Sequence, residues 1–107
     1  MSNYNHYTYR ITWSQEDNEY VALCAEFPSL SYLAETQSEA LTGMLKLVKE
    51  VVADMQANDE PLPEPFAERE YSGKFIVRIP PEQHKHLALE AAEQGVSLNR
   101  YISSKLV

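Results

Sequence analysis

The 107-residue sequence has a single cysteine, Cys24, so it can form no disulfide within the chain and no paired-cysteine metal site. Apolar residues never run on for the eighteen or so positions that a membrane-spanning helix needs, which predicts no membrane partner. The N-terminal residues also lack the apolar core of a secretory signal peptide. These absences predict a soluble cytoplasmic protein without a cofactor, in which Cys24 is a small buried side chain.

Basic residues are scarce in the first two thirds of the chain. Residues 1–70 contain four Lys and Arg against thirteen Asp and Glu, a net charge of −9, whereas residues 71–107 contain five against three, a net charge of +2. This separation indicates two partners of opposite charge, with nucleic acid for the basic end and something basic for the acidic part. An acidic part that only keeps the protein soluble is the simpler alternative.

The basic end predicts one short strand followed by two helices. Residues 74–79 are rich in β-branched and aromatic residues, and a Pro-Pro pair follows them and stops the strand. Pro81 can begin a helix over residues 82–94, and Gly95 suits the left-handed residue that closes one. Ser97 can then cap a second helix. The apolar face of this second helix consists of Leu98, Tyr101, Ile102 and Leu106.

This segment is too small to bury a core alone, and a lone strand leaves both of its edges unpaired. Two copies solve both problems if their strands pair antiparallel, because alternate side chains of the ribbon then face opposite ways. The residues expected to build the dimer are Phe75, Val77, Ile79, Leu87, Tyr101 and Ile102. The residues expected to face outward from the ribbon are Lys74, Ile76 and Arg78.

A two-stranded ribbon fits the major groove of DNA, where Arg and Lys donate to guanine O6 and N7. The N-terminus of the second helix can hold a backbone phosphate through Ser97, Leu98 and Asn99. The strings KFIVRIP and GVSLNRYI resemble those of ribbon-helix-helix repressors of the Arc and MetJ type, although small repressors of that class usually have a polar residue in place of Ile76. The alternative is a dimerisation module that contacts no nucleic acid.

The first sixty residues predict a small antiparallel sheet with one helix. Residues 7–14 alternate apolar and polar side chains, which is typical of a strand with one buried face. Residues 19–27 predict a second strand and residues 30–33 a short third one. Thr36 and Glu39 form a capping box that opens a helix. Apolar residues then recur at spacings of three and four, at Ala40, Leu41, Met44, Leu47, Val48, Val51, Val52 and Met55.

Within that helix, Gly43 is expected to mark close packing. From residue 58 onward, alternating prolines and acids without a period predict an extended linker. The predicted organisation is therefore an α+β domain at residues 1–60, an acidic proline-rich linker at 61–72, and a ribbon-helix-helix domain at 73–107.

The string YVALCAEFPSLSYLAETQSEAL resembles the N-terminal domain of the HicB family of antitoxins. The positions that match the family pattern are Glu26-Phe27-Pro28, Leu30, Thr36 and Glu39-Ala40-Leu41, while Ser29 and Ala34 replace the usual glycines. One branch of that family joins this domain, a partial RNase H-like fold, to a ribbon-helix-helix domain. The resemblance then covers essentially the whole chain.

The resemblance implies the antitoxin of a type II toxin-antitoxin system. The first domain would bind and block a basic HicA-type toxin that cleaves mRNA, without catalysing any reaction. The C-terminal domain would bind the double-stranded operator DNA of the shared operon, as a homodimer or a higher even oligomer. A ribbon-helix-helix repressor without a toxin partner is the nearest alternative.

A nuclease is the alternative from another class, because RNase H-like enzymes cut nucleic acid with two metal ions held by carboxylates. That chemistry needs acids that converge from a central strand and a neighbouring helix. Residues 7–14 contain no acid and Glu39 is explained as part of a cap, so Glu26 is the residue to test. The remaining nearby acids, in or beside a hairpin loop, are Glu16, Asp17 and Glu19.

A metal-sensing repressor is a third interpretation. His84 and His86 are two residues apart on the same predicted helix, so they point to different faces, whereas a chelating pair needs a spacing of three or four. No metal site and no catalytic residue is therefore predicted.

Overall fold

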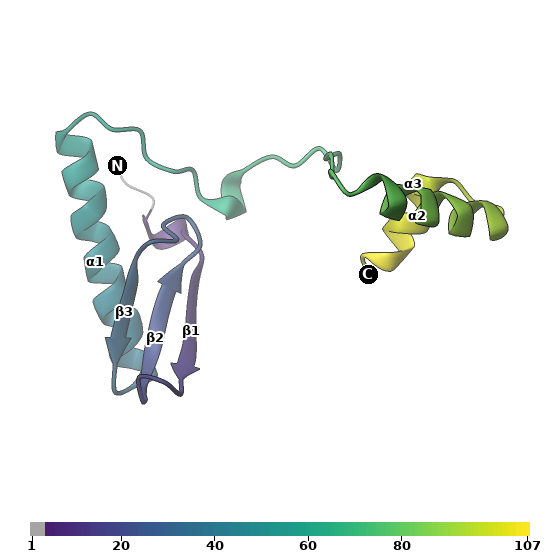
Figure 1. Cartoon of the computed structure of the whole chain (residues 1–107). Coiled ribbons are helices and arrows are strands. Elements are labelled where there is room, and N and C mark those ends of the chain that lie inside the picture. Colours follow the sequence, from purple (N-terminus) through teal and green to yellow (C-terminus); the bar gives the residue numbers. More distant parts are fainter. Residues whose placement is uncertain (1–3) are drawn as a thin grey trace. The chain divides into compact units, whose positions relative to one another are not determined.

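The structure, a computed structural model, describes residues 4–107. The chain divides into two compact units, Met1–Tyr71 and Ser72–Val107. The first holds strands β1 (Tyr9–Ser14), β2 (Glu19–Cys24) and β3 (Ser31–Ala34) and helix α1 (Gln37–Ala57), with short 3₁₀ helices at Tyr4–His6 and Phe66–Glu68. The second holds helices α2 (Pro81–Glu93) and α3 (Leu98–Lys105) (Figure 1). The predicted α+β class is confirmed.

The three strands form one antiparallel sheet in the order β1-β2-β3. Ala22, on the central strand, lies opposite Ile11 on one side and opposite Tyr32 on the other. The second strand ends at Cys24 rather than at residue 27, because the chain turns there and the Phe27 N–H donates to the Cys24 carbonyl at 3.1 Å. The three predicted strands are thus present, with ends that differ from the prediction by at most three residues.

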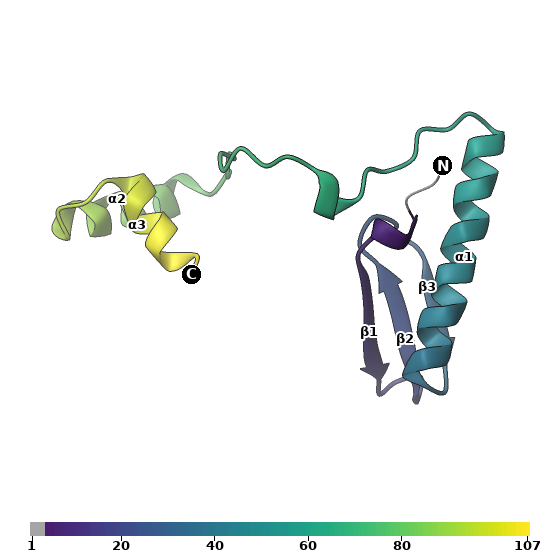
Figure 2. The same cartoon turned by 180° about the vertical axis from the view of Figure 1, so that it is seen from behind.

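Helix α1 begins at the predicted capping box. The hydroxyl of Thr36 accepts from the backbone N–H of Glu39 at 3.1 Å and donates to the Glu39 carboxylate at 3.0 Å. One side of the helix lies across one face of the sheet (Figures 1 and 2). The buried core consists of Tyr7, Ala22, Cys24, Ala34, Ala40, Met44, Val48 and Val52. The apolar stripe predicted for the helix is confirmed at its centre, while Leu41 at its margin is exposed.

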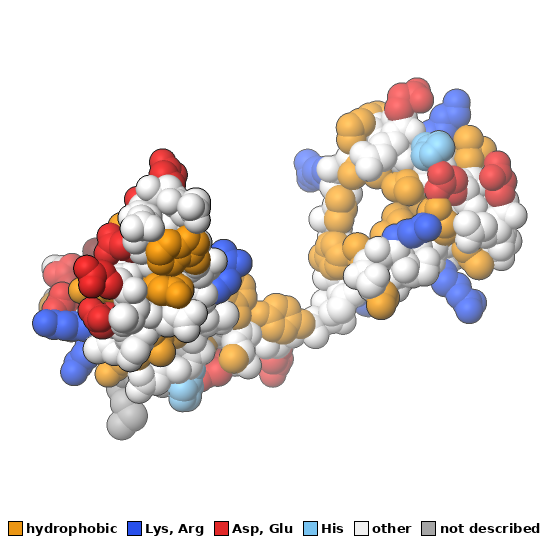
Figure 3. Space-filling view, turned by 90° about the horizontal axis from the view of Figure 1, so that it is seen from below, with side chains coloured by type: hydrophobic (Ala, Val, Ile, Leu, Met, Phe, Trp, Pro, Cys, Tyr) orange, Lys and Arg blue, Asp and Glu red, His pale blue; other side chains and the backbone are white. Residues whose placement is uncertain are grey.

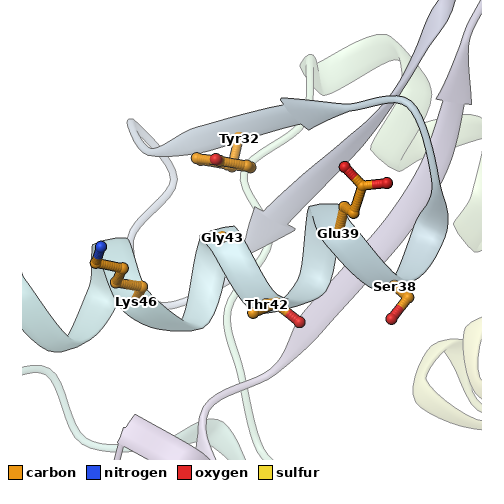
Figure 4. Close-up of a pocket in the computed structure, with 6 residues that line it drawn as sticks. All are labelled: Tyr32, Ser38, Glu39, Thr42, Gly43 and Lys46. Atoms are coloured by element: carbon orange, nitrogen blue, oxygen red, sulfur yellow. The ribbon is translucent and has the colours of Figure 1, made fainter.

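Gly43 allows α1 to pack closely against the sheet. A Cβ atom at this position would lie 2.1 Å from Cε1 of Tyr32, far inside van der Waals contact. Figure 4 shows the Tyr32 ring lying over the helix at Gly43. The close packing predicted at this glycine is confirmed.

Within residues 4–107, no helix covers the second face of the sheet, as comparison of Figures 1 and 2 shows. Side chains alternate across a strand, so Val21 and its register partner Leu33 lie on the face opposite to Ala22. Leu33 is exposed and Val21 is half-buried. The core of this unit therefore lies entirely between α1 and one face of the sheet.

The chain after α1 returns to the same unit. Leu62 packs against the core, and the Tyr7 hydroxyl donates to the Pro63 carbonyl at 2.7 Å. The unit ends at Tyr71, which lies within the linker predicted at residues 61–72. The division into domains at 1–60, 61–72 and 73–107 stays a prediction.

In the C-terminal unit, the residues predicted to start and stop the first helix lie at the two ends of α2. Pro81 is the first residue of α2, and Gly95 after its end has a φ of 70°. The N–H groups of Gly95 and Val96 donate back to the carbonyls of Ala92 and Ala91, which closes the helix. Residues 74–79 form no strand within this single chain, because a strand is defined by its hydrogen bonds to another. The ribbon between two copies stays a prediction.

Among residues 4–107, no helix is long and apolar enough to cross a membrane.

Candidate nucleic-acid interface

In the segment of residues 74–79, the side chains of Lys74, Ile76 and Arg78 are accessible to a partner. All three side chains are exposed, and Ile76 is 90% exposed. Gly73 precedes the segment with a φ of 81°, a left-handed conformation that favours glycine, and Pro80 follows it. Within residues 4–107, neither Lys74 nor Arg78 forms an ion pair. Both cations are therefore available to an anionic partner.

The alternate residues of the same segment expose apolar surface. Phe75 is 73% exposed and Val77 is 64% exposed, whereas Ile79 is half-buried. Figure 3 shows hydrophobic side chains gathered around a hollow in the C-terminal unit. Covering apolar side chains of this size is stabilising, so this side of the segment is suited to contact with a second copy of the chain. The dimer role of these residues stays a prediction.

The N-terminus of α3 presents free backbone donors. The Ser97 hydroxyl accepts from the Arg100 N–H at 3.1 Å, so it is used as the predicted helix cap. The first helical backbone bond runs from the Tyr101 N–H to the Ser97 carbonyl at 2.9 Å. The N–H groups of Leu98 and Asn99 precede that bond and remain free for an acceptor such as a phosphate oxygen.

Helices α2 and α3 are joined by a hydrogen bond that sequence reasoning missed. Tyr101 is buried, and its hydroxyl donates to the Glu90 carboxylate, which also pairs with His86 at 2.7 Å. The Tyr101 hydroxyl lowers the pKa of Glu90 below its ordinary value, with a smaller contribution from the charge of His86. Tyr101, expected at the dimer contact, thus packs against α2 of its own chain. Leu87 and Ile102, expected there too, are both half-buried.

Glu26, the residue to test for the nuclease alternative, is a buried carboxylate in the N-terminal unit and is only 8% exposed. Its oxygens accept from the backbone N–H groups of Thr8 and Phe66, each at 2.9 Å, and from the Thr8 hydroxyl at 3.2 Å. The Cys24 thiol lies 3.6 Å from the same carboxylate. Glu26 therefore ties the start of β1 and the segment after α1 to the end of β2.

These donors determine the charge state of Glu26. Burial raises its pKa, but the N–H groups of Phe66 and Thr8 stabilise the carboxylate more strongly, and the pKa lies below its ordinary value. Burial also raises the pKa of the Cys24 thiol, which is 2% exposed as expected for a small buried residue. The carboxylate is thus ionised and engaged with backbone donors, a structural arrangement that sequence reasoning did not anticipate.

The other candidate ligands do not gather around Glu26. In the part of the chain that the structure describes, no three side chains of His, Cys, Asp or Glu are grouped so that they could hold a metal ion. Glu39 belongs to the cap of α1, and Asp17 accepts from the Ser14 hydroxyl at 2.7 Å in the β1–β2 turn. His6 pairs with Glu68, and His84 is exposed on α2.

Within residues 4–107 the structure thus has an acidic α+β unit and a second unit in which an exposed basic segment precedes two helices in the sequence. The model of the HicB family matches residues 57–106, which include residues 74–79 and both C-terminal helices. Over residues 57–106 the chain is therefore similar to the HicB family, and this match supports a HicB-like antitoxin at the level of the family. Comparisons with curated proteins and with solved structures gave no match.

Proposed function

We propose that this chain is an antitoxin that neutralises a basic, mRNA-cleaving toxin of the HicA type by direct binding and represses its own operon. The observation that carries the proposal is the HicB family match over a segment in which two unpaired cations alternate with exposed apolar side chains. The family match supports an antitoxin, and the alternation of cations with exposed apolar side chains supports a dimeric DNA-binding ribbon. Such a repressor acts in the cytoplasm, where the operator lies.

The DNA-binding half of the proposal rests on the residues at the C-terminal end. In an antiparallel pair of chains, Phe75 and Val77 would be covered by the helices while Lys74 and Arg78 face the major groove. The backbone N–H groups of Leu98 and Asn99 would hold a phosphate and fix the register of the ribbon on the duplex. The homodimer doubles each contact, so the operator is expected to contain two half-sites.

The toxin-binding half rests on the charge of the first unit. Residues 1–70 carry a net charge of −9, and Figure 3 shows acidic side chains gathered on one side of the N-terminal unit. A basic toxin would be attracted to this unit over a distance, which speeds the encounter and disfavours acidic competitors. Binding alone neutralises the toxin, so this unit needs no catalytic group.

Arg78→Ala is expected to weaken operator binding by about 1 to 3 kcal/mol for each affected contact, because it removes a bidentate base contact. The measurement is a salt-series titration against DNA from immediately upstream of the gene, with random DNA for comparison. The control is Lys46→Ala, which removes a positive charge that is also exposed, from α1 in the other unit. Operator binding that is equal for both variants would rule out the ribbon as the DNA reader.

The same Arg78→Ala variant separates the two halves of the proposal in cells. We expect it to protect against the toxin as well as the wild-type chain does, since the change lies outside the acidic unit. Operon repression should be lost while growth under toxin expression is retained. Loss of protection together with repression would show that the C-terminal unit contributes to toxin binding.

A further inference from the structure

Ile76 stands out among the large apolar side chains of the structure. It is 90% exposed, more than any other large apolar residue in residues 4–107 except the terminal Val107. Its neighbours at two residues on either side are the cations Lys74 and Arg78. Since side chains alternate along an extended segment, all three share one side, away from Phe75 and Val77. An apolar side chain therefore lies between the two groups available to DNA.

This position does not suit Ile76 for the dimer core. If the apolar residues Phe75 and Val77 are covered by the second copy, Ile76 faces away from that contact. In water it gains nothing from its size. In the major groove, by contrast, each thymine presents one apolar group, its C5-methyl, and no other base of unmodified DNA presents one there.

We propose, on the basis of the DNA-binding function proposed above, that Ile76 determines operator specificity by packing against the C5-methyl group of thymine. Lys74 and Arg78 would contact guanine on either side of that thymine. An extended chain rises about 3.3 Å per residue, so each cation starts about 6.6 Å from Ile76 along the segment. Successive bases on one strand are about 3.4 Å apart. The operator half-site therefore contains a thymine about two base pairs from each guanine contact.

The test removes the methyl group without changing base pairing. DNA from immediately upstream of the gene is amplified once with dTTP and once with dUTP, so that uracil replaces thymine on the second probe. The full-length wild-type protein should bind the uracil probe about fourfold less tightly for each of the two Ile76 contacts, or about fifteenfold in total, since burial of one methyl group accounts for about that factor. Both probes are also titrated with the Ile76→Ala variant.

The variant separates the methyl contact from any general effect of uracil on the duplex. Ile76→Ala should bind both probes with equal affinity. Its oligomeric state and helix content should equal those of the wild type, because the Ile76 side chain is exposed. A uracil effect that persists in Ile76→Ala would overturn the assignment, since another residue would then contact the methyl. If the wild type bound both probes tightly and with equal affinity, the assignment of Ile76 to the thymine methyl would be overturned, while the proposed repressor function would stand. No preference for either probe over random DNA would overturn both proposals.

Discussion

Replacing Glu26 with alanine should destabilise the N-terminal unit by about 3 kcal/mol, which is a large share of the stability of a small domain. The change removes the acceptor of two backbone N–H groups, those of Thr8 and Phe66, and leaves these donors without a partner in a partly buried site. The measurement is urea unfolding followed by tryptophan fluorescence. Trp13 is the only tryptophan of the chain and lies on β1, so the signal reports the N-terminal unit.

Glu50→Ala is the matched control, because Glu50 is an exposed acid on α1. It should change the free energy of unfolding by no more than about 0.5 kcal/mol. Equal effects of the two substitutions would mean that the Glu26 contacts add nothing to stability. A fragment of residues 1–60 should also unfold at a lower urea concentration than one of residues 1–71, since it lacks Phe66 and the Pro63 carbonyl that accepts from Tyr7.

Glu26 also sets a dependence of stability on pH. Its pKa is lower in the folded state than in the unfolded chain, because backbone donors stabilise the carboxylate. The stabilisation is therefore fully present above the ordinary pKa of 4.5 and is lost as the pH falls through the lower folded pKa. In urea unfolding, the difference between wild type and Glu26→Gln should be constant near neutral pH and should shrink below about pH 4. A difference that grows with acidity would reverse this assignment.

The elements of the fold were predictable where their causes are local. The β1 alternation, the Thr36–Glu39 box and the Gly95 stop each act within a few residues, and each is present in the structure. Glu26 was not predictable as a structural residue, because its donors are eighteen and forty residues away in sequence. The bond between Glu90 and Tyr101 spans eleven residues and two helices, so no helical period signals it.

The candidate interface was predictable only as a pattern. Alternation assigns Lys74 and Arg78 to one side of the segment, and the structure leaves both exposed. What completes the site lies outside the chain, because the partner of residues 74–79 would be another copy. The period of a segment predicts which of its side chains share a face. No spacing within one sequence shows which face contacts a second molecule.

The largest expected effect in the C-terminal unit comes from Val77→Asp, which should convert the dimer to a monomer. In the proposed ribbon, Val77 faces the contact between two copies, and a carboxylate buried there without a partner costs several kcal/mol. Light scattering should then give the mass of one 12.2 kDa chain instead of two. Helix content should fall as well, since in the proposed dimer the second copy covers the apolar surface of α2 and α3.

Ile76→Asp is the matched substitution on the next residue, with the same new charge on the opposite side of the segment. It should remain a dimer and lose operator binding, because its carboxylate would lie among the phosphates of the groove. The two variants together test the inward and outward assignment directly. A monomeric Ile76→Asp beside a dimeric Val77→Asp would reverse that assignment, and two dimers with full helix content would place dimerisation outside residues 74–79. Only the expected pair of results supports a ribbon in which one side builds the dimer and the other reads DNA.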